Sequence, residues 1–329
     1  MSRVTEETVA EATEQLGIEP SSQILGRSPW QIFWTRFKKD RVALVAMGFL
    51  IFLALVAILA PLISKWVGHG PNQLFSDVAL NEIGLPVVGP SKEFFFGVDI
   101  SARDVFVRTV YGAKTSLTVA ILATGIAVFI GIVLGSLAGY HGRWVDTLIS
   151  RTIDLVLSLP VLLFSIGIAA VCSITAEGCL GGLVQPGITL VTFIIALFTW
   201  PYVARIVRGQ VLSLREKEFI ESARSLGSGS TRIMFREVLP NLAAPIIVYS
   251  TLIIPSNILF EAALSFLGVG IPPETPSWGR MISDGSSGQL YTVAWWMLLF
   301  PGIALVLTTL AFNLVGDGLR DALDPRTQG

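Results

Sequence analysis

The sequence carries few residues that could do chemistry on a bound molecule. The stretch YGAKTS, Tyr111 to Ser116, superficially resembles a nucleotide-binding loop, but the glycine-rich run that should precede the lysine is missing. Without amides to hold phosphates, we expect no ATP site on this chain. The two histidines, His69 and His141, are separated by a long apolar stretch, so we expect no metal site. We find no nucleophile–base set and predict no catalytic residue and no bound cofactor.

Two cysteines form a second candidate for chemistry. Cys172 and Cys179 lie seven positions apart and are the whole cysteine content of the chain. In an oxidising exterior they could pair as a disulfide. Two free thiols, one at a helix end and one in a loop, are the other interpretation, and the sequence leaves both open.

Polar side chains also interrupt one apolar stretch, residues 242–268. Ionisable residues inside a membrane span are functional candidates, because burying a charge in hydrocarbon is costly. We therefore predict that four polar residues of this stretch line a translocation path: Ser256, Asn257, Glu261 and Ser265. A hydrogen bond between helices is the alternative role for Glu261.

The elements that must position these residues are apolar. Of 329 residues, 52% are hydrophobic and 14% are charged, whereas a soluble domain is about 25% charged. Six apolar stretches are near the roughly 20 residues that a spanning helix needs. They cover residues 42–63, 115–139, 148–174, 187–207, 242–268 and 292–315. We predict an all-α integral membrane protein with six transmembrane helices, since β-barrel strands would be shorter and alternating.

The spans divide the chain into segments. We expect a tail and an interfacial segment at 1–41, the first helix at 42–63, a core at 113–316 and a second tail at 317–329. Residues 64–112 are rich in proline and glycine. A structureless loop of this length is unusual, so we predict a small lobe between the first two helices.

The basic residues predict the orientation. Segments 1–41, 140–151, 205–241 and 316–329 hold 6, 2, 7 and 2 Lys or Arg residues, which makes 17 of the 23 in the chain. Short cytoplasmic segments are enriched in Lys and Arg. We therefore predict that both termini are cytoplasmic and that the lobe lies outside.

One cytoplasmic segment, Leu212 to Asn241, is too charged to cross a bilayer. Ser213 and Glu216 fit a capping box, and Gly227 suits the position after a helix end, so we predict a helix over 213–227. Its apolar face comprises Phe219, Ile220, Ala223 and Leu226. We expect Ser230 to cap a second helix that ends at Pro240. The first helix could lie on the membrane surface, or it could dock into a groove on a soluble partner.

A specific resemblance favours docking. EFIESARSLG, then nine residues, then EVLPN, resembles the EAA motif of binding-protein-dependent ABC importer permeases, with matches at Glu221, Ala223, Gly227, Leu239 and Pro240. Ser222 replaces the second alanine, and Glu237 stands where an aliphatic residue is usual. The resemblance implies a coupling helix that contacts an ATPase through Glu218, Phe219, Glu221, Ser222, Ala223, Arg224, Leu226, Gly227, Leu239 and Pro240.

The resemblance extends from about Arg36 to Arg326. FGVDISARDVFVRTVYGAKTSL, AGYHGRWVDTLISRTIDLVLSLP, EAALSFLGVGIPPETPSWGRMI and FNLVGDGLRDALDPR are similar to C-type permeases of the dipeptide/oligopeptide/nickel subfamily. Ala102 replaces a usual glycine in the first of these. The resemblance implies the type I ABC importer (MetI-like) permease fold.

The same resemblance implies the partners. A homologous B-type permease would complete a heterodimer, and two cytoplasmic subunits would bind ATP and Mg²⁺. An extracytoplasmic binding protein would deliver peptides or related small polar solutes, such as nickel chelates. We expect a multi-pass protein of the bacterial inner membrane, in contact with membrane lipid and with no nucleic acid.

Three alternatives remain. A secondary transporter driven by an ion gradient would predict acidic relays and detectable repeats, whereas Glu261 is isolated and no clear repeat is present. A membrane enzyme would need a nucleophile–base set or metal ligands. A passive channel gives no reason for the charged helix at 213–227.

Overall fold

The computed structural model describes residues 29–323, except 82–84 and 87. The predicted tail at 1–28 and the last six residues lie outside the described residues. The α-helices are α2 (Pro29–Phe37), α3 (Arg41–Ile58), α4 (Ala60–Val67), α5 (Ser76–Ala79), α6 (Val105–His141), α7 (Arg143–Ser158), α8 (Val161–Cys172), α9 (Ile188–Leu214), α10 (Glu218–Ser225), α11 (Ser230–Ile233), α12 (Leu239–Phe266), α13 (Trp278–Ser286) and α14 (Trp296–Leu323). Shorter helical segments are η1 (Leu180–Gly182), the π-helical η2 (Met234–Val238) and η3 (Ser287–Thr292).

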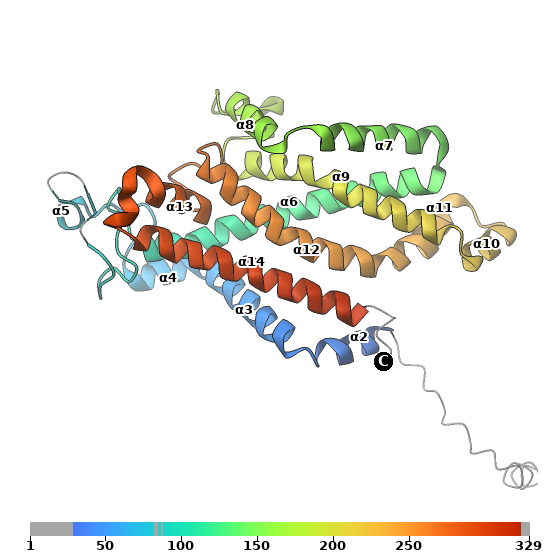
Figure 1. Ribbon diagram of the computed structural model, residues 1–329, viewed down its shortest axis with the longest axis horizontal. Coiled ribbons are helices and arrows are strands. Elements are labelled where there is room, and N and C mark those ends of the chain that lie inside the picture. The colour runs from blue at the N-terminus through green and yellow to red at the C-terminus, as the bar shows by residue number, and fades with distance from the viewer. Residues whose placement is uncertain (1–28, 82–84, 87, 324–329) are drawn as a thin grey trace, which may run out of the picture.

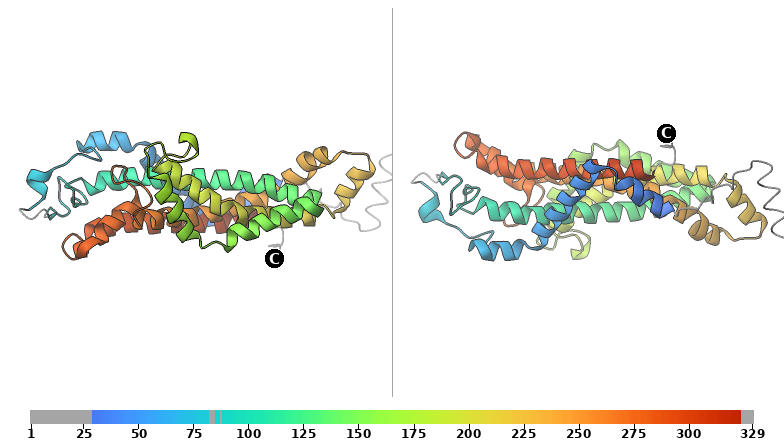
Figure 2. Two further views of the ribbon diagram at one scale, coloured as in Figure 1. Left: turned by 90° about the horizontal axis from the view of Figure 1, so that it is seen from above. Right: turned by 90° about the horizontal axis from the view of Figure 1, so that it is seen from below.

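The long helices form an elongated bundle. In Figure 1, α3, α6, α9, α12 and α14 run along the long axis, and Figure 2 shows the same bundle from above and below. α10 and α11 lie at one end, together with α2 and the end of α14, whereas α4, α5 and α13 lie at the opposite end. We call these the α10 end and the lobe end.

Five helices within the described residues are long and apolar enough to cross a membrane: α3, α6, α9, α12 with the segment before it, and α14. The predicted span at 148–174 is wrong as a single helix. It is a pair, α7 and α8, bent by 87°. Pro160 lies at the break, where its missing N–H and its ring prevent a continuous helix. The predicted six spans are therefore five helices and one broken pair.

Two predicted boundaries also need correction. α6 begins at Val105, well inside the segment assigned to the lobe. Its 37 residues make a helix about 55 Å long at 1.5 Å per residue, which exceeds the roughly 30 Å of a hydrocarbon core. α14 likewise continues through the predicted tail at 317–329 as far as Leu323.

α6 and α9 pack backbone against backbone. A Cβ added at Gly135 would lie 2.6 Å from the carbonyl oxygen of Ala204, and one at Gly139 would lie 2.8 Å from the Cβ of Val211. Small residues spaced by four permit such an approach between membrane helices. The two helices therefore form a tightly fitted pair.

The lobe is ordered by polar contacts beside an aromatic cluster. His69 Nδ1 lies 2.6 Å from Asp104 Oδ2, and the imidazole stacks on Phe94 with ring centroids 5.0 Å apart. Asp104 also caps α6 by accepting from the amide of Val107. Ala102, which replaces a glycine usual in the resembling permeases, is buried with φ of 60°. Glycine adopts a positive φ more readily than alanine, which explains why glycine suits that site.

A disulfide cross-links the loop between α8 and α9. In the structure Cys172, the last residue of α8, is joined to Cys179 in a disulfide, with the two Cα atoms 5.0 Å apart. The amide of Cys179 also donates to the carbonyl of Val184 at 2.9 Å. The loop therefore has a short, cross-linked turn at the lobe end of the bundle.

The tight fit of α6 on α9 can be tested with a pair of variants on one helix. We expect Gly135→Leu to destabilise the protein by about 1–3 kcal/mol, because the added side chain must displace the α9 backbone. Gly125→Leu is the matched control, since no described atom lies within 4 Å of a Cβ there. Thermal unfolding of purified protein in detergent measures both. Equal melting temperatures for the two variants would contradict close α6–α9 packing.

The disulfide predicts a cross-linked peptide. Digestion of denatured, unreduced protein with a glutamate-specific protease, which can cut after Glu177 between the two cysteines, should yield one species that contains both Cys172 and Cys179, and reduction should separate it into two. Mass spectrometry detects both states. Denaturation is needed because Cys172 is buried and would resist alkylation even as a free thiol. Quantitative alkylation of both thiols without reductant would show that the bridge is absent in the membrane protein.

Candidate functional site

The predicted coupling helix is α10, shorter than the sequence indicated. It runs from Glu218 to Ser225. The amide of Gly227 donates to the carbonyl of Arg224 at 2.9 Å, and the amide of Ser228 donates to that of Ala223 at 3.0 Å. These two bonds and the φ of +80° at Gly227 form a Schellman end, so the position of Gly227 after the helix end, predicted from the sequence, is confirmed.

The predicted capping residues are wrong. Ser213 lies in the last turn of α9, which ends at Leu214, so Ser213 and Glu216 do not start α10. Lys217 holds the cap position without a side-chain bond. Ser230 is the first residue of α11 rather than its cap, because Gly229 takes that position.

Pro240 does not end the second helix either. The helix continues from α11 through η2 into α12, where Leu239 and Pro240 are the first residues. Proline cannot donate to the carbonyl four residues before it. The wider π-helical turn of η2 directly precedes this position, so the chain continues as a helix despite the missing donor.

α10 has a buried and an exposed face. Ile220 is fully buried and packs in one cluster with Val211 of α9 and Val238 of η2, while Ala223 is half-buried. The rest of the predicted coupling residues on this helix and at its end are exposed: Glu218, Phe219, Glu221, Ser222, Arg224, Leu226 and Gly227. Leu226 is 86% exposed, which is unusual for a large apolar side chain. The helix is therefore anchored by one face and free to bind with the other.

Three of the four predicted path residues are buried between helices. The carboxylate of Glu261 accepts from Ser116 of α6 and from Ser265, each at 2.8 Å. The side chain of Asn257 bridges Thr199 of α9, at 3.1 Å, and Thr124 of α6, at 2.8 Å. The structure thus favours the alternative role for Glu261. Ser256 is exposed and can still face a path.

The polar partners of these residues were not predicted. Ser116 is 145 residues from Glu261, and Thr124 is 133 residues from Asn257. A hydroxyl in an apolar stretch is the signal that could have found them, because buried polar groups need hydrogen-bond partners.

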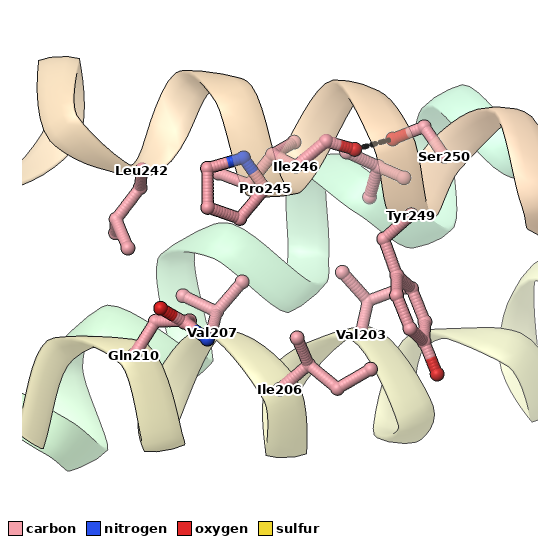
Figure 3. A pocket seen from close by; sticks show the side chains of 10 residues that line it. Val203, Ile206, Val207, Gln210, Leu242, Pro245, Ile246, Tyr249 and Ser250 are labelled. Carbon is pink, nitrogen blue, oxygen red and sulfur yellow. Dashed lines mark hydrogen bonds between the residues drawn. The ribbon is translucent and has the colours of Figure 1, made fainter. Parts of the chain in front are cut away.

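A narrow space lies between α9 and α12 (Figure 3). Ile206, Val207 and Gln210 of α9 face Leu242, Pro245 and Tyr249 of α12. Its volume of about 10 Å³ is close to the smallest space that holds one water molecule. The hydroxyl of Ser250 is turned to its own helix, where it donates to the carbonyl of Ile246 at 2.6 Å. This interface is closed to solute within the single chain.

An unpredicted cluster of charges joins the lobe to the bundle. Arg108 of α6 is 1% exposed and donates to the carbonyls of Pro71 and Pro273, each at 3.1 Å. Its Nε lies 3.4 Å from a carboxylate oxygen of Asp99. One buried guanidinium therefore connects the lobe with the loop between α12 and α13.

Known families match most of the chain. Residues 131–329 match the family described as the binding-protein-dependent transport system inner membrane component. Residues 28–81 match the N-terminal transmembrane domain of oligopeptide transport permease C.

Curated relatives cover nearly the whole chain. The dipeptide transport system permease protein DppC of Alkalihalophilus pseudofirmus is 41% identical over 307 residues, 93% of each chain. The glutathione transport system permease protein GsiD of Salmonella paratyphi A is 42% identical over 304 residues, 92% of each chain.

A solved structure shares the fold. An inward-facing structure of the MetNI methionine ABC transporter superposes with a TM-score of 0.52 at 16% identity, and it covers 67% of this chain and 96% of that chain. The match confirms the predicted MetI-like permease fold. The relatives support the predicted permease and not the ion-driven alternative. With its α10 geometry, its spans and these matches, the chain belongs to the binding-protein-dependent transport system inner membrane components, as a C-type permease.

Proposed function

We propose that this chain forms half of the translocation pathway of an ABC importer for peptides or related small polar solutes. The named relatives are permeases for dipeptide and glutathione, which supports this class of solute. Nickel chelates remain within the proposed range. A homologous B-type permease forms the other half of the pathway, and an extracytoplasmic binding protein delivers the solute.

The observation that carries the proposal is the exposed face of α10. Exposed apolar side chains rimmed by charges mark interaction surfaces, and Phe219 and Leu226 are 40% and 86% exposed beside Glu218, Glu221 and Arg224. Each of two cytoplasmic ATPase subunits, which bind ATP and Mg²⁺, grips one such helix. In this chain the ATPase contacts Phe219, Leu226 and the exposed residues around them.

The buried face of α10 explains how force reaches the spans. Ile220 belongs to one buried cluster with Val207 and Val211 of α9 and with Val238 and Leu242 of the adjoining helix. A displacement of α10 must therefore move the ends of two spans, because packed side chains resist compression. ATP-driven closure of the ATPases would rock the spans between two openings.

The structure supports the orientation that the basic residues predict. α2, α10 and the end of α14 share one end of the bundle (Figure 1), and the lobe lies at the other. Among the described residues, segments 29–41, 140–151, 205–241 and 316–323 lie toward this end and hold 14 of the 20 Lys and Arg residues, so we propose that this end is cytoplasmic in a bacterial cell, as the sequence predicts for both termini.

The proposed contact between α10 and the ATPase can be tested with two glycine variants, one in the contact and one outside it. Gly227→Val places a branched side chain at φ of +80° and alters the end of the exposed face. We expect roughly tenfold weaker binding of the ATPase subunits, equal to about 1.4 kcal/mol, and a similar loss from Glu221→Lys. Pull-down of the ATPases and solute uptake by reconstituted vesicles measure the effect.

Gly68→Val is the control for backbone strain. Gly68 ends α4 with φ of +82°, it has no described atom within 4 Å of an added Cβ, and it lies at the lobe end. It should carry a similar strain cost and leave ATPase binding intact. Wild-type assembly and uptake by the Gly227 and Glu221 variants would show that α10 is only a surface helix.

The orientation predicts a labelling pattern. In a variant without Cys172 and Cys179, a cysteine at Leu74, which is 62% exposed in the lobe, should react with an impermeant thiol reagent on intact cells. A cysteine at the exposed Ser225 of α10 should react only after permeabilisation. Labelling of Ser225→Cys on intact cells would reverse the proposed topology.

A further inference from the structure

A cavity of about 270 Å³ lies beside the coupling helix, between the end of α6 and the helix formed by α11, η2 and the start of α12. Part of its lining is apolar, with Ile132, Leu137, Met234 and Leu239 among the residues. An apolar space of this size beside a membrane helix suits a hydrocarbon chain better than water.

The other part of the lining is polar. It comprises Tyr140 and His141 at the end of α6 and Ser230 and Thr231 at the start of α11. Two guanidinium groups stand close by. Arg224 of α10 lies over the ring of Tyr140, 5.9 Å from its centroid, and Arg215 donates to the carbonyl of Gly139 at 3.2 Å. No Asp or Glu occurs among the described lining residues, so this end of the cavity favours an anion.

One lining residue has an unmet hydrogen bond. Ser136 is 6% exposed, and its hydroxyl has no hydrogen-bond partner within the described part of the chain. A buried hydroxyl without a partner is costly and asks for an explanation. The Oγ atom itself is closed to solvent, so an acceptor oxygen in the cavity, such as a carbonyl ester, satisfies it only when the side chain turns toward the cavity.

The depth of the cavity restricts its occupant. Ser136 precedes the last residue of α6 by five positions, about 8 Å along the axis. α6 is longer than the hydrocarbon core is thick, and we place this level, near the end of the helix, at the boundary between acyl chains and headgroups. Basic pockets between helices at this level on the cytoplasmic side hold anionic lipid headgroups.

We infer that the cavity binds one anionic phospholipid of the cytoplasmic leaflet. Its acyl chain lies against Ile132, Leu137 and Met234, and its phosphate lies near Arg224 and His141. The lipid thereby joins the coupling helix to the end of α6. The inference rests on the proposed orientation, with the α10 end in the cytoplasm.

The test measures lipid on the intact transporter, without any readout of transport. The purified complex is exchanged into phosphatidylglycerol or phosphatidylcholine nanodiscs and then analysed by native mass spectrometry. We expect one retained phosphatidylglycerol that phosphatidylcholine does not replace. Arg224→Gln should lower its occupancy about fivefold, the effect expected for one basic residue at a membrane surface.

A matched pair of tryptophan variants controls for the cavity itself. Val133 lines this cavity, and Leu122, on the same helix, lines a different one. Both are exposed aliphatic residues of α6. Val133→Trp should remove the retained lipid, and Leu122→Trp should keep it.

Two outcomes would overturn the inference. Equal retention of phosphatidylcholine would show that the headgroup charge is not recognised. Cross-linking of Val133→Cys to the partner permease, with none to a photoreactive phosphatidylglycerol, would show that a protein helix fills the cavity. Neither outcome affects the coupling proposal, because that proposal is judged by ATPase pull-down with the Gly227 and Glu221 variants.

Discussion

Direct backbone contact between α6 and α9 is the constraint on which the rest of the structure depends. Gly131, Gly135 and Gly139 bring the two helices so close that side chains of α9 occupy the space where a Cβ would stand. In a bilayer, such packing replaces the hydrophobic drive that holds soluble helices together. Only three residues separate α9 from α10, so the α6–α9 contact determines where the exposed face of α10 lies. A wider spacing would displace Val207 and Val211, and with them the cluster that receives Ile220.

α12 completes that cluster but is built differently. Pro245 and Pro255 each remove a backbone donor inside the helix, and η2 widens the turn before Pro240. Missing i→i−4 bonds lower the cost of bending at those points. A push on α10 therefore meets α9, which lacks one interior donor at Pro201 but packs closely on α6, and α12, which lacks two interior donors. Because α12 bends more easily than its neighbours, a displacement of α10 moves α12 first, whereas a uniformly rigid bundle would have no such preferred element.

Local signals in the sequence predicted much of the fold and of the coupling site. Apolar stretches located the spans, and the EAA-like residues with Gly227 located α10 and its end. The predictions that failed depended on contacts between residues that are far apart in the sequence. The predicted capping box at Ser213 does not form, because α9 continues beside α6 as far as Leu214 and so includes Ser213. Pro160 can be read in the sequence, but the 87° angle between α7 and α8 cannot, and both helices pack on α9 in the structure. The burial of Glu261 required Ser116, on a helix that hydropathy alone does not place beside it.

The polar groups inside the bundle hold helices rather than solute. An unpaired carboxylate or amide in hydrocarbon would cost several kcal/mol, and Glu261 and Asn257 avoid this cost by bonding to α6 and α9. Each bond is made only in one register of α12, so these residues fix its rotation. The consequence is that the polar side chains most suited to bind a solute are already committed. Under the proposed assembly, the path must be lined by surfaces that a single chain leaves exposed, such as the one bearing Ser256. Those surfaces enclose a path only when a second permease faces them, which is the physical reason for proposing that the chain works as half of a pore.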